Sequence, residues 1–276
     1  FGSLEKLLNY TVSNKVDYLV LMGTTGEAVT LSKDEKFALL DFVKEHLNGR
    51  IPLILGMGGY NTQEVINNLQ TTDLKGVDAI LSVTPYYNKP SQRGLFLHYK
   101  NIASASPLPV ILYNVPGRTS VNMTAETTLQ LANEVNGIIG IKEASGNMGQ
   151  IMDIINHKPN DFLVISGDDA MTLPLIAAGA QGVISVTANA YPSAFSRMVN
   201  EALAGKFDEA RKLHYLLLPF MQVLFADGSP GGIKAALDNM KIVSNNLRLP
   251  VVKVGKAIQN QINAAIAELK EKNIDC

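Results

Sequence analysis

The stretch IIGIKEA, residues 138–144, decides the fold. Its apolar half, residues 138–141, has the nearly continuous apolar character of a strand covered on both faces. Six further runs share this character: 17–23 (DYLVLMG), 52–58 (PLILGMG), 79–85 (AILSVTP), 109–115 (PVILYNV), 162–168 (FLVISGD) and 182–188 (GVISVTA). Because helical stretches separate these runs, the sequence predicts parallel strands joined by crossover helices, in a barrel or in a doubly wound sheet.

The stretches between the runs carry signals for helix starts and stops. Ser32 and Glu35 form a capping-box pattern ahead of residues 36–47, and Gly49 follows as a stop. Three further residues are predicted N-caps of later helices: Thr62, Thr124 and Ser193. After Tyr191 the sequence is predicted to be helical and to contain no further strand.

The predicted fold is an α/β (β/α)8 barrel with a C-terminal helical appendage. Seven strand-like runs are present where a closed barrel has eight strands, and the opening residues 3–16 have the pattern of a helix that follows a strand. We therefore expect the first barrel strand to be missing from this sequence. The predicted domains are a barrel catalytic domain over residues 1–205 and a helical domain over residues 206–276.

Composition excludes several classes of function. Hydrophobic residues make up 46% and charged residues 18% of the chain, and a net charge of −1 gives no reason to expect nucleic acid or membrane as a partner. The apolar runs are far shorter than the roughly 20 residues that cross a bilayer, and the start lacks a signal-peptide pattern. The sole cysteine is Cys276, and the four histidines are scattered, so we expect no disulfide, metal or other cofactor, and a cytoplasmic location.

Lys142 and Tyr113 are the first candidates for chemistry, because barrel enzymes place catalytic groups at the carboxyl ends of strands. A desolvated Lys142 would have a lowered pKa and a free amine able to attack a ketone; alternatively its ammonium reaches water. The Tyr113 phenol is a candidate proton shuttle beside that amine, or an ordinary core tyrosine with its hydroxyl at the rim.

Two other strand ends carry candidate binding groups. Thr24 and Thr25 lie in a glycine-flanked turn whose hydroxyl and N–H groups could hold a carboxylate or relay a proton, although such a pair is often an ordinary turn. Arg118 offers a bidentate fork to a second carboxylate, or is a solvated loop arginine. The gathering of these groups at successive strand ends favours the functional interpretation.

Six motifs together resemble the dihydrodipicolinate synthase family of the pyruvate-aldolase superfamily. They are GTTGE (23–27), TPYYNKPSQRGL (84–95), ILYNVPGRT (111–119), GIKEASG (140–146), SGDD (166–169) and GVISVTAN (182–189). The resemblance covers residues 3 to 250 and implies a Schiff-base lyase that condenses pyruvate with L-aspartate 4-semialdehyde, toward diaminopimelate and lysine. It also implies a homotetramer built as a dimer of dimers.

The resemblance further implies a role for each matching residue. Lys142 would form the Schiff base, Tyr113 would donate and accept protons, and Thr24 and Tyr87 would relay them, with Tyr87 reaching into the neighbouring subunit's site. The implied substrate-binding residues are Thr25, Arg118, Gly167 and Ile184, with Arg118 holding the carboxylate of the semialdehyde.

Two alternatives remain open on the sequence. One is another pyruvate aldolase, such as N-acetylneuraminate lyase or a 2-keto-3-deoxy sugar acid aldolase, and Arg118 of the YNVPGRT motif argues against it. The other is a catalytically silent barrel kept as a binding protein, against which Lys142, Tyr113 and Thr24 argue.

Overall fold

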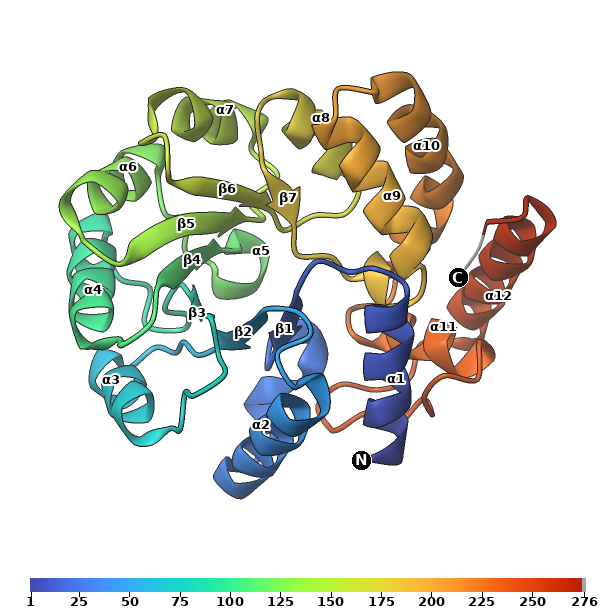
Figure 1. Ribbon diagram of the computed structural model, residues 1–276, viewed down its shortest axis with the longest axis horizontal. Coiled ribbons are helices and arrows are strands. Elements are labelled where there is room, and N and C mark those ends of the chain that lie inside the picture. Colours follow the sequence, from blue (N-terminus) through green and yellow to red (C-terminus); the bar gives the residue numbers. More distant parts are fainter. Residues whose placement is uncertain (275–276) are drawn as a thin grey trace. The chain divides into compact units, whose positions relative to one another are not determined.

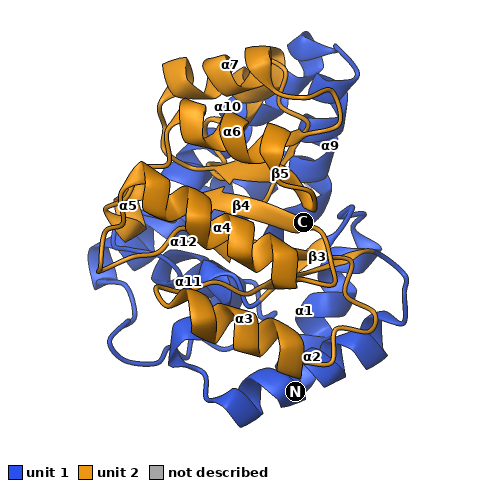
Figure 2. Cartoon of the chain, turned by 90° about the vertical axis from the view of Figure 1, so that its left-hand side faces the viewer, with its two compact units in different colours: residues 1–18, 22–51, 185–276 blue, residues 19–21, 52–184 orange. Residues whose placement is uncertain are grey.

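The computed structural model describes residues 1–274, so Cys276 lies outside the described residues. The chain forms two compact units (Figure 2): unit 1 comprises residues 1–18, 22–51 and 185 onward, and unit 2 comprises residues 19–21 and 52–184. The predicted boundary between residues 205 and 206 falls inside unit 1, and the division into a barrel domain and a helical domain stays a prediction.

Unit 2 contains a seven-stranded parallel sheet whose strand order follows the chain (Figure 1). Its strands are β1 (Leu19–Leu21), β2 (Leu53–Gly56), β3 (Ala79–Val83), β4 (Val110–Asn114), β5 (Ile138–Glu143), β6 (Leu163–Ser166) and β7 (Gly182–Val183). Each predicted run contains one of these strands. A parallel sheet in sequential order, with helices between its strands, is the arrangement of the (β/α)8-barrel class, so the predicted fold class is confirmed.

The strands are shorter than the runs that predicted them, most clearly at the end of the sheet. β7 ends at Val183, whereas the run continued to Ala188, and residues Thr187–Asn189 form the 3-10 turn η3. Among the described residues, β1 pairs with β2 and β7 pairs with β6. The apolar run of 184–188 therefore does not continue the strand, and within it only Thr187 is fully buried.

Helices alternate with the strands of unit 2, and all except the short α5, which follows β4 at its carboxyl end, cover one face of its sheet (Figure 1). They are α3 (Thr62–Thr71), α4 (Gln92–Ala105), α5 (Pro116–Thr119), α6 (Ala125–Glu134), α7 (Met148–His157) and α8 (Thr172–Ala177). Leu112 of β4 and Ile141 of β5 pack in one core cluster with Leu95, Leu131 and Ile151 from α4, α6 and α7. Burying one such side chain stabilises a fold by about 1.5–3 kcal/mol, so this cluster fixes which strand residues face the helices.

Unit 1 is helical. Its helices are α1 (Gly2–Ser13), α2 (Lys33–Leu47), α9 (Pro192–Leu203), α10 (Phe207–Val223), α11 (Gly231–Asn239) and α12 (Lys256–Glu271). Two 3-10 turns, η1 (Thr24–Gly26) and η2 (Ala28–Thr30), precede α2. α10 packs against both α9 and α12. No helix within residues 1–274 has the length and apolarity to cross a membrane.

Two of the predicted helix starts are confirmed. The Ser32 N–H donates to Glu35 Oε2 at 2.8 Å and the Glu35 N–H donates to Ser32 Oγ at 3.2 Å, which completes the capping box of α2. The Thr124 hydroxyl accepts from the Thr127 N–H at 3.3 Å and caps α6. The left-handed residue that ends α2 is Asn48, with Gly49, also at positive φ, directly after it.

The other two predicted N-caps, Thr62 and Ser193, are wrong. The Asn61 side chain caps α3 by accepting from two backbone N–H groups, and Thr62 is the first helical residue, its hydroxyl 2.8 Å from His98 Nδ1. α9 begins at Pro192, one residue before Ser193, with no side-chain cap. Proline at the first helical position lacks an N–H, so one of the groups that a cap would satisfy is absent there.

Candidate active site

Lys142 and Tyr113 occupy paired positions at the carboxyl ends of two neighbouring strands. In the β4–β5 ladder, Tyr113 pairs with Lys142 and the next residue, Asn114, pairs with Glu143. Successive side chains of a strand point to opposite faces of the sheet. Because Leu112 and Ile141 face the helices, Tyr113 and Lys142 face the other side together.

The Lys142 side chain is buried against the Tyr113 ring. Lys142 is 9% exposed, and its Nζ lies 4.2 Å from the centroid of the ring. Burial lowers its pKa from 10.5 to about 8; the Asp169 carboxylate partly opposes this shift and the Arg118 guanidinium adds to it. At pH 7 roughly a tenth of the amine is then unprotonated, against fewer than about one part in a thousand for an ordinary lysine. The structure thus favours a desolvated Lys142 over one that reaches water.

Gly167 provides the space in which the lysine stem lies. A Cβ added at this position would lie 2.7 Å from Ala144 Cβ and 3.0 Å from Lys142 Cε. The Gly167 N–H donates to the Glu143 carbonyl at 2.8 Å, which extends the β5–β6 pairing past the end of β6. A side chain at 167 would press on both Ala144 and the lysine stem, so these two neighbours together favour glycine there.

Arg118 lies on the short helix α5 directly after β4. Pro116 occupies the first turn of this helix and Ser120 ends it in the left-handed conformation. The buried Thr119 hydroxyl donates to the Val115 carbonyl at 3.2 Å and accepts from Thr84 Oγ1 at 3.3 Å. These bonds join α5 to its own start and to the end of β3. They hold the backbone that carries Arg118 in place relative to the strands.

A buried polar network lies on the helix side of the same two strands. Glu143 is 1% exposed, and the Asn114 amide donates to both of its carboxylate oxygens at 3.2 Å. The Ser145 N–H donates to Oε1 at 2.8 Å and the Gln150 amide donates to Oε2 at 3.2 Å. Burial raises the pKa of the Glu143 carboxyl, while these hydrogen bonds oppose the shift.

The Glu143 network fixes the register in which the candidate residues lie. The Met123 N–H donates to Asn114 Oδ1 at 3.0 Å, so the amide is oriented from the chain that precedes α6. Asn114 and Glu143 are the direct neighbours of Tyr113 and Lys142. A one-residue slip between β4 and β5 would break these bonds and move the lysine to the other face of the sheet.

The remaining predicted site residues are less closely gathered. The Ile184 N–H donates to the Ser166 carbonyl at 2.9 Å, just past β7 in unit 2. Tyr87 is 90% exposed and its backbone has a positive φ of 68°. Thr24 and Thr25 lie in η1 of unit 1, where the Thr24 carbonyl accepts from the Glu27 N–H at 3.1 Å. Lys142 thus lies against Tyr113 and beside Gly167, and the charge of Arg118 acts on its amine.

Sequence reasoning named no role for three residues that bear on Lys142: Asp169, Asn114 and Glu143. Asn114 and Glu143 could have been found from alternation, because polar residues at helix-facing strand positions need buried partners. Asp169, which is 3% exposed, is the last residue of the SGDD motif and gives no comparable local signal. Within residues 1–274, no three His, Cys, Asp or Glu side chains form a cluster that could hold a metal ion.

Comparison with known proteins gives close relatives over nearly the whole chain. A curated 4-hydroxy-tetrahydrodipicolinate synthase of Parabacteroides distasonis is 51% identical over 272 residues, which cover 99% of this chain and 92% of the relative. The crystal structure of dihydrodipicolinate synthase from Thermotoga maritima is 37% identical, with a TM-score of 0.95, covering 99% of this chain and 93% of that one.

A third relative was solved with a small molecule bound. Dihydrodipicolinate synthase from Acinetobacter baumannii, complexed with pyruvate, is 39% identical and has a TM-score of 0.94, again covering 99% of this chain and 93% of that one. The model of the dihydrodipicolinate synthetase family matches residues 1–269. With a buried, low-pKa lysine at the end of β5 and this extent of similarity, the chain belongs to the dihydrodipicolinate synthetase family.

Proposed function

We propose that this protein is a 4-hydroxy-tetrahydrodipicolinate synthase that condenses pyruvate with L-aspartate 4-semialdehyde. The observation that carries the proposal is the buried Lys142 amine, its pKa lowered to about 8, against the ring of Tyr113. A free amine in a desolvated site is the group that a Schiff-base mechanism needs, because only the unprotonated form attacks a ketone. Family membership supports the synthase over the other pyruvate aldolases.

In the proposed mechanism, Lys142 Nζ adds to the C2 carbonyl of pyruvate, and loss of water leaves a Schiff base. Removal of a C3 proton gives an enamine, whose carbon attacks the aldehyde of the second substrate. Tyr113 is proposed as the general acid and base for these proton transfers, with Thr24 and Tyr87 as the relay. The position of the Tyr113 ring beside the Lys142 amine supports this role. The role requires the phenol oxygen to come within hydrogen-bonding distance of the reacting atoms.

The proposed binding residues divide between the two substrates. Thr25, Gly167 and Ile184 are assigned to pyruvate, and Arg118 is assigned to the carboxylate of the semialdehyde. An arginine suits this task because its fork binds a carboxylate through two parallel hydrogen bonds. Its proximity to Lys142, evident in its effect on the lysine pKa, supports a second substrate held beside the Schiff base.

The proposal extends to assembly and location. We infer a homotetramer, a dimer of dimers, in which Tyr87 reaches the site of a neighbouring subunit. The nearly complete exposure of Tyr87 supports this, because a large aromatic side chain in water is typical of a residue that another chain covers. The proposed location is the cytoplasm, with no cofactor required.

Borohydride trapping tests the proposed function. Incubation with pyruvate and sodium borohydride is expected to modify Lys142 alone, as read by peptide mass spectrometry, and Lys142→Arg serves as the control that cannot form the adduct. Condensation of pyruvate with the semialdehyde is then measured against cleavage of N-acetylneuraminate. Trapping at another lysine would reject the mechanism. Cleavage of N-acetylneuraminate that is faster than condensation with the semialdehyde would reject the proposed substrate.

A further inference from the structure

Glu27 lies at the junction of the two 3-10 turns that carry and follow Thr24 and Thr25. It ends η1 and begins η2, in the left-handed conformation with φ of 52°. Its N–H donates to the Thr24 carbonyl at 3.1 Å, and its own carbonyl accepts from the Thr30 N–H at 3.0 Å. A non-glycine residue at positive φ is uncommon, and it persists where the surroundings hold it in place.

The carboxylate of Glu27 is held from the C-terminal part of unit 1. Lys234 of α11 forms an ion pair with Glu27 Oε2, and the two side chains are 25% and 10% exposed. The Arg248 N–H donates to Glu27 Oε1 at 3.0 Å. Lys234 also donates to the Asn246 carbonyl at 2.6 Å, so the lysine joins the turn to the segment that precedes Arg248.

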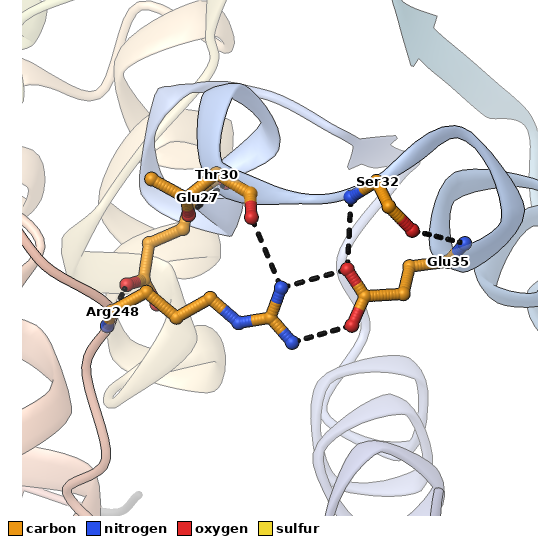
Figure 3. Close-up of polar contacts among 5 residues, drawn as sticks. All are labelled: Glu27, Thr30, Ser32, Glu35 and Arg248. Atoms are coloured by element: carbon orange, nitrogen blue, oxygen red, sulfur yellow. Dashed lines mark hydrogen bonds and ion pairs between the residues drawn. The ribbon is translucent and has the colours of Figure 1, made fainter.

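The Arg248 guanidinium adds two further attachments, shown in Figure 3. It donates to the Thr30 carbonyl at 3.0 Å, and it binds both oxygens of Glu35 at 2.7 and 2.6 Å. Glu35 is the capping-box residue of α2, and hydrogen bonding from Arg248 is the largest cause that lowers its pKa, to about 2. One arginine therefore holds both the end of η2 and the start of α2.

The threonine turn, η1 with Thr24 and Thr25, contains few hydrogen bonds of its own. Within η1 two backbone bonds close the turn, from the Gly26 N–H to the Gly23 carbonyl and from the Glu27 N–H to the Thr24 carbonyl, each at 3.1 Å. Such a single 3-10 turn has poor hydrogen-bond geometry and is easily deformed. A mostly buried ion pair with a planar, bidentate arginine beside it supplies the rigidity that the turn lacks.

We propose that Lys234 and Arg248 are positioning residues of the active site, which hold the Thr24–Thr25 turn in its working geometry. Lys234 acts on the turn through Glu27, and the Arg248 guanidinium acts on it through Thr30 of η2 and Glu35 of α2. The inference rests on the proposed roles of Thr24 in proton relay and Thr25 in pyruvate binding. It assigns the C-terminal helical segment a task in the reaction: residues 234–248 set the positions of two groups that touch the substrate.

The test compares Arg248→Ala, Arg248→Lys and Lys234→Met in the full chain. Arg211→Ala and Lys212→Ala are the matched controls, because these residues form exposed ion pairs with Asp208 and Glu209 elsewhere in the C-terminal helices. We expect Arg248→Ala and Lys234→Met to lose tenfold or more in kcat and to raise the KM for pyruvate. Arg248→Lys is expected to recover part of the loss, and the controls to stay within twofold of wild type.

Amide hydrogen exchange separates this inference from the proposed function. In Arg248→Ala the amides of Gly26, Glu27 and Thr30 should exchange at least tenfold faster than in wild type, whether or not the wild type is a synthase. If the wild type had no synthase activity, the proposed function would be rejected. The exchange rates would still show whether Lys234 and Arg248 hold the turn. If Arg248→Ala does not fold, the same comparison is made with Arg248→Lys at a threefold threshold. Unchanged exchange, or kcat within twofold of wild type in both Arg248→Ala and Lys234→Met, would overturn the inference.

Discussion

Lys142 Nζ lies 4.2 Å from the centroid of the Tyr113 ring, and the two residues are register partners in the β4–β5 ladder. Their separation is therefore set by backbone hydrogen bonding between two strands rather than by a loop. Groups on rigid elements keep the short distances that proton transfer requires.

The pH dependence of imine trapping should report the lowered pKa of Lys142. A lowered pKa means that the amine loses its proton at lower pH than an ordinary lysine, so reactivity rises with pH and levels off above the pKa. We expect the rate of borohydride trapping with pyruvate to rise through an inflection near pH 8, close to the pKa of about 8. An inflection near the ordinary value of 10.5 would show that burial does not tune this amine.

Tyr113→Phe removes one hydroxyl and leaves the ring beside the amine. Loss of a positioned proton shuttle lowers turnover by roughly 10²–10⁴-fold, and we expect a decrease in kcat within that range. Steady-state kinetics measure it, and Tyr10→Phe is the control, because the Tyr10 hydroxyl donates to the Ala190 carbonyl at 2.6 Å within unit 1. Turnover of Tyr113→Phe near that of wild type would assign the proton transfers to another group.

Gly167→Ala should displace the Lys142 side chain while leaving the amine itself unchanged. The added Cβ would lie 3.0 Å from Lys142 Cε and 2.7 Å from Ala144 Cβ, closer than packed carbon atoms approach. We expect trapping of pyruvate at Lys142 to slow at least tenfold, measured by mass spectrometry over time. Gly182→Ala is the matched control, since a Cβ there meets no atom of the described residues within 4 Å. Equal trapping rates in the two variants would mean that the site yields to the extra methyl group.

Glu143→Gln tests the network behind the two candidate residues. The carboxylate accepts hydrogen bonds from Asn114, Ser145 and Gln150, and an amide would place its own N–H₂ group against donors. An unsatisfied buried polar group costs about 1–3 kcal/mol, so the free energy of unfolding should fall by that amount in chemical denaturation. Glu134→Gln, at the exposed end of α6, is expected to change little. Equal stability of the two variants would show that the network rearranges at no cost.

Arg118→Ala separates the two substrates. Without the guanidinium, the carboxylate of the semialdehyde loses its charge-assisted partner, so its KM should rise at least tenfold more than the KM for pyruvate. Initial rates with each substrate varied in turn give both values. Removal of this charge should also raise the pKa of Lys142 slightly, because Arg118 contributes to lowering it. Parallel losses for both substrates would make Arg118 a structural residue.

Much of the fold follows from local patterns, and the exceptions have physical causes. The seven strands were predictable because buried parallel strands are nearly continuous apolar runs. The position of Lys142 at a strand end followed in the same way. The start of α3 was placed one residue late because Asn61 and Thr62 are both good caps, and the choice between them depends on His98, which is distant in sequence and bonds the Thr62 hydroxyl.

The parts of the site that the sequence did not predict depend on long-range contacts. The sequence offered both a desolvated Lys142 beside Tyr113 and a lysine that reaches water, and the choice between them required the register of two strands. The Glu143 network required residues from four segments of the chain. The pairing of Glu27 with Lys234 and Arg248 joins residues 207 and 221 positions apart, where no periodicity or spacing rule applies. Such pairs are visible only in three dimensions.

The length of that last connection has a consequence for the order in which the protein is built. Each strand of the sheet pairs with its sequence neighbour, so the ladder can form progressively while the chain leaves the ribosome. The bond from the Arg248 N–H to Glu27 cannot form until residue 248 has been synthesised, and closing so long a loop carries a larger entropic cost than pairing adjacent strands. The threonine turn near the start of the chain is therefore among the last parts of the molecule to gain its final contacts. A nascent chain that stops short of Arg248 would be able to form β5, the strand that carries Lys142, but its threonine turn would lack the contacts that Arg248 makes.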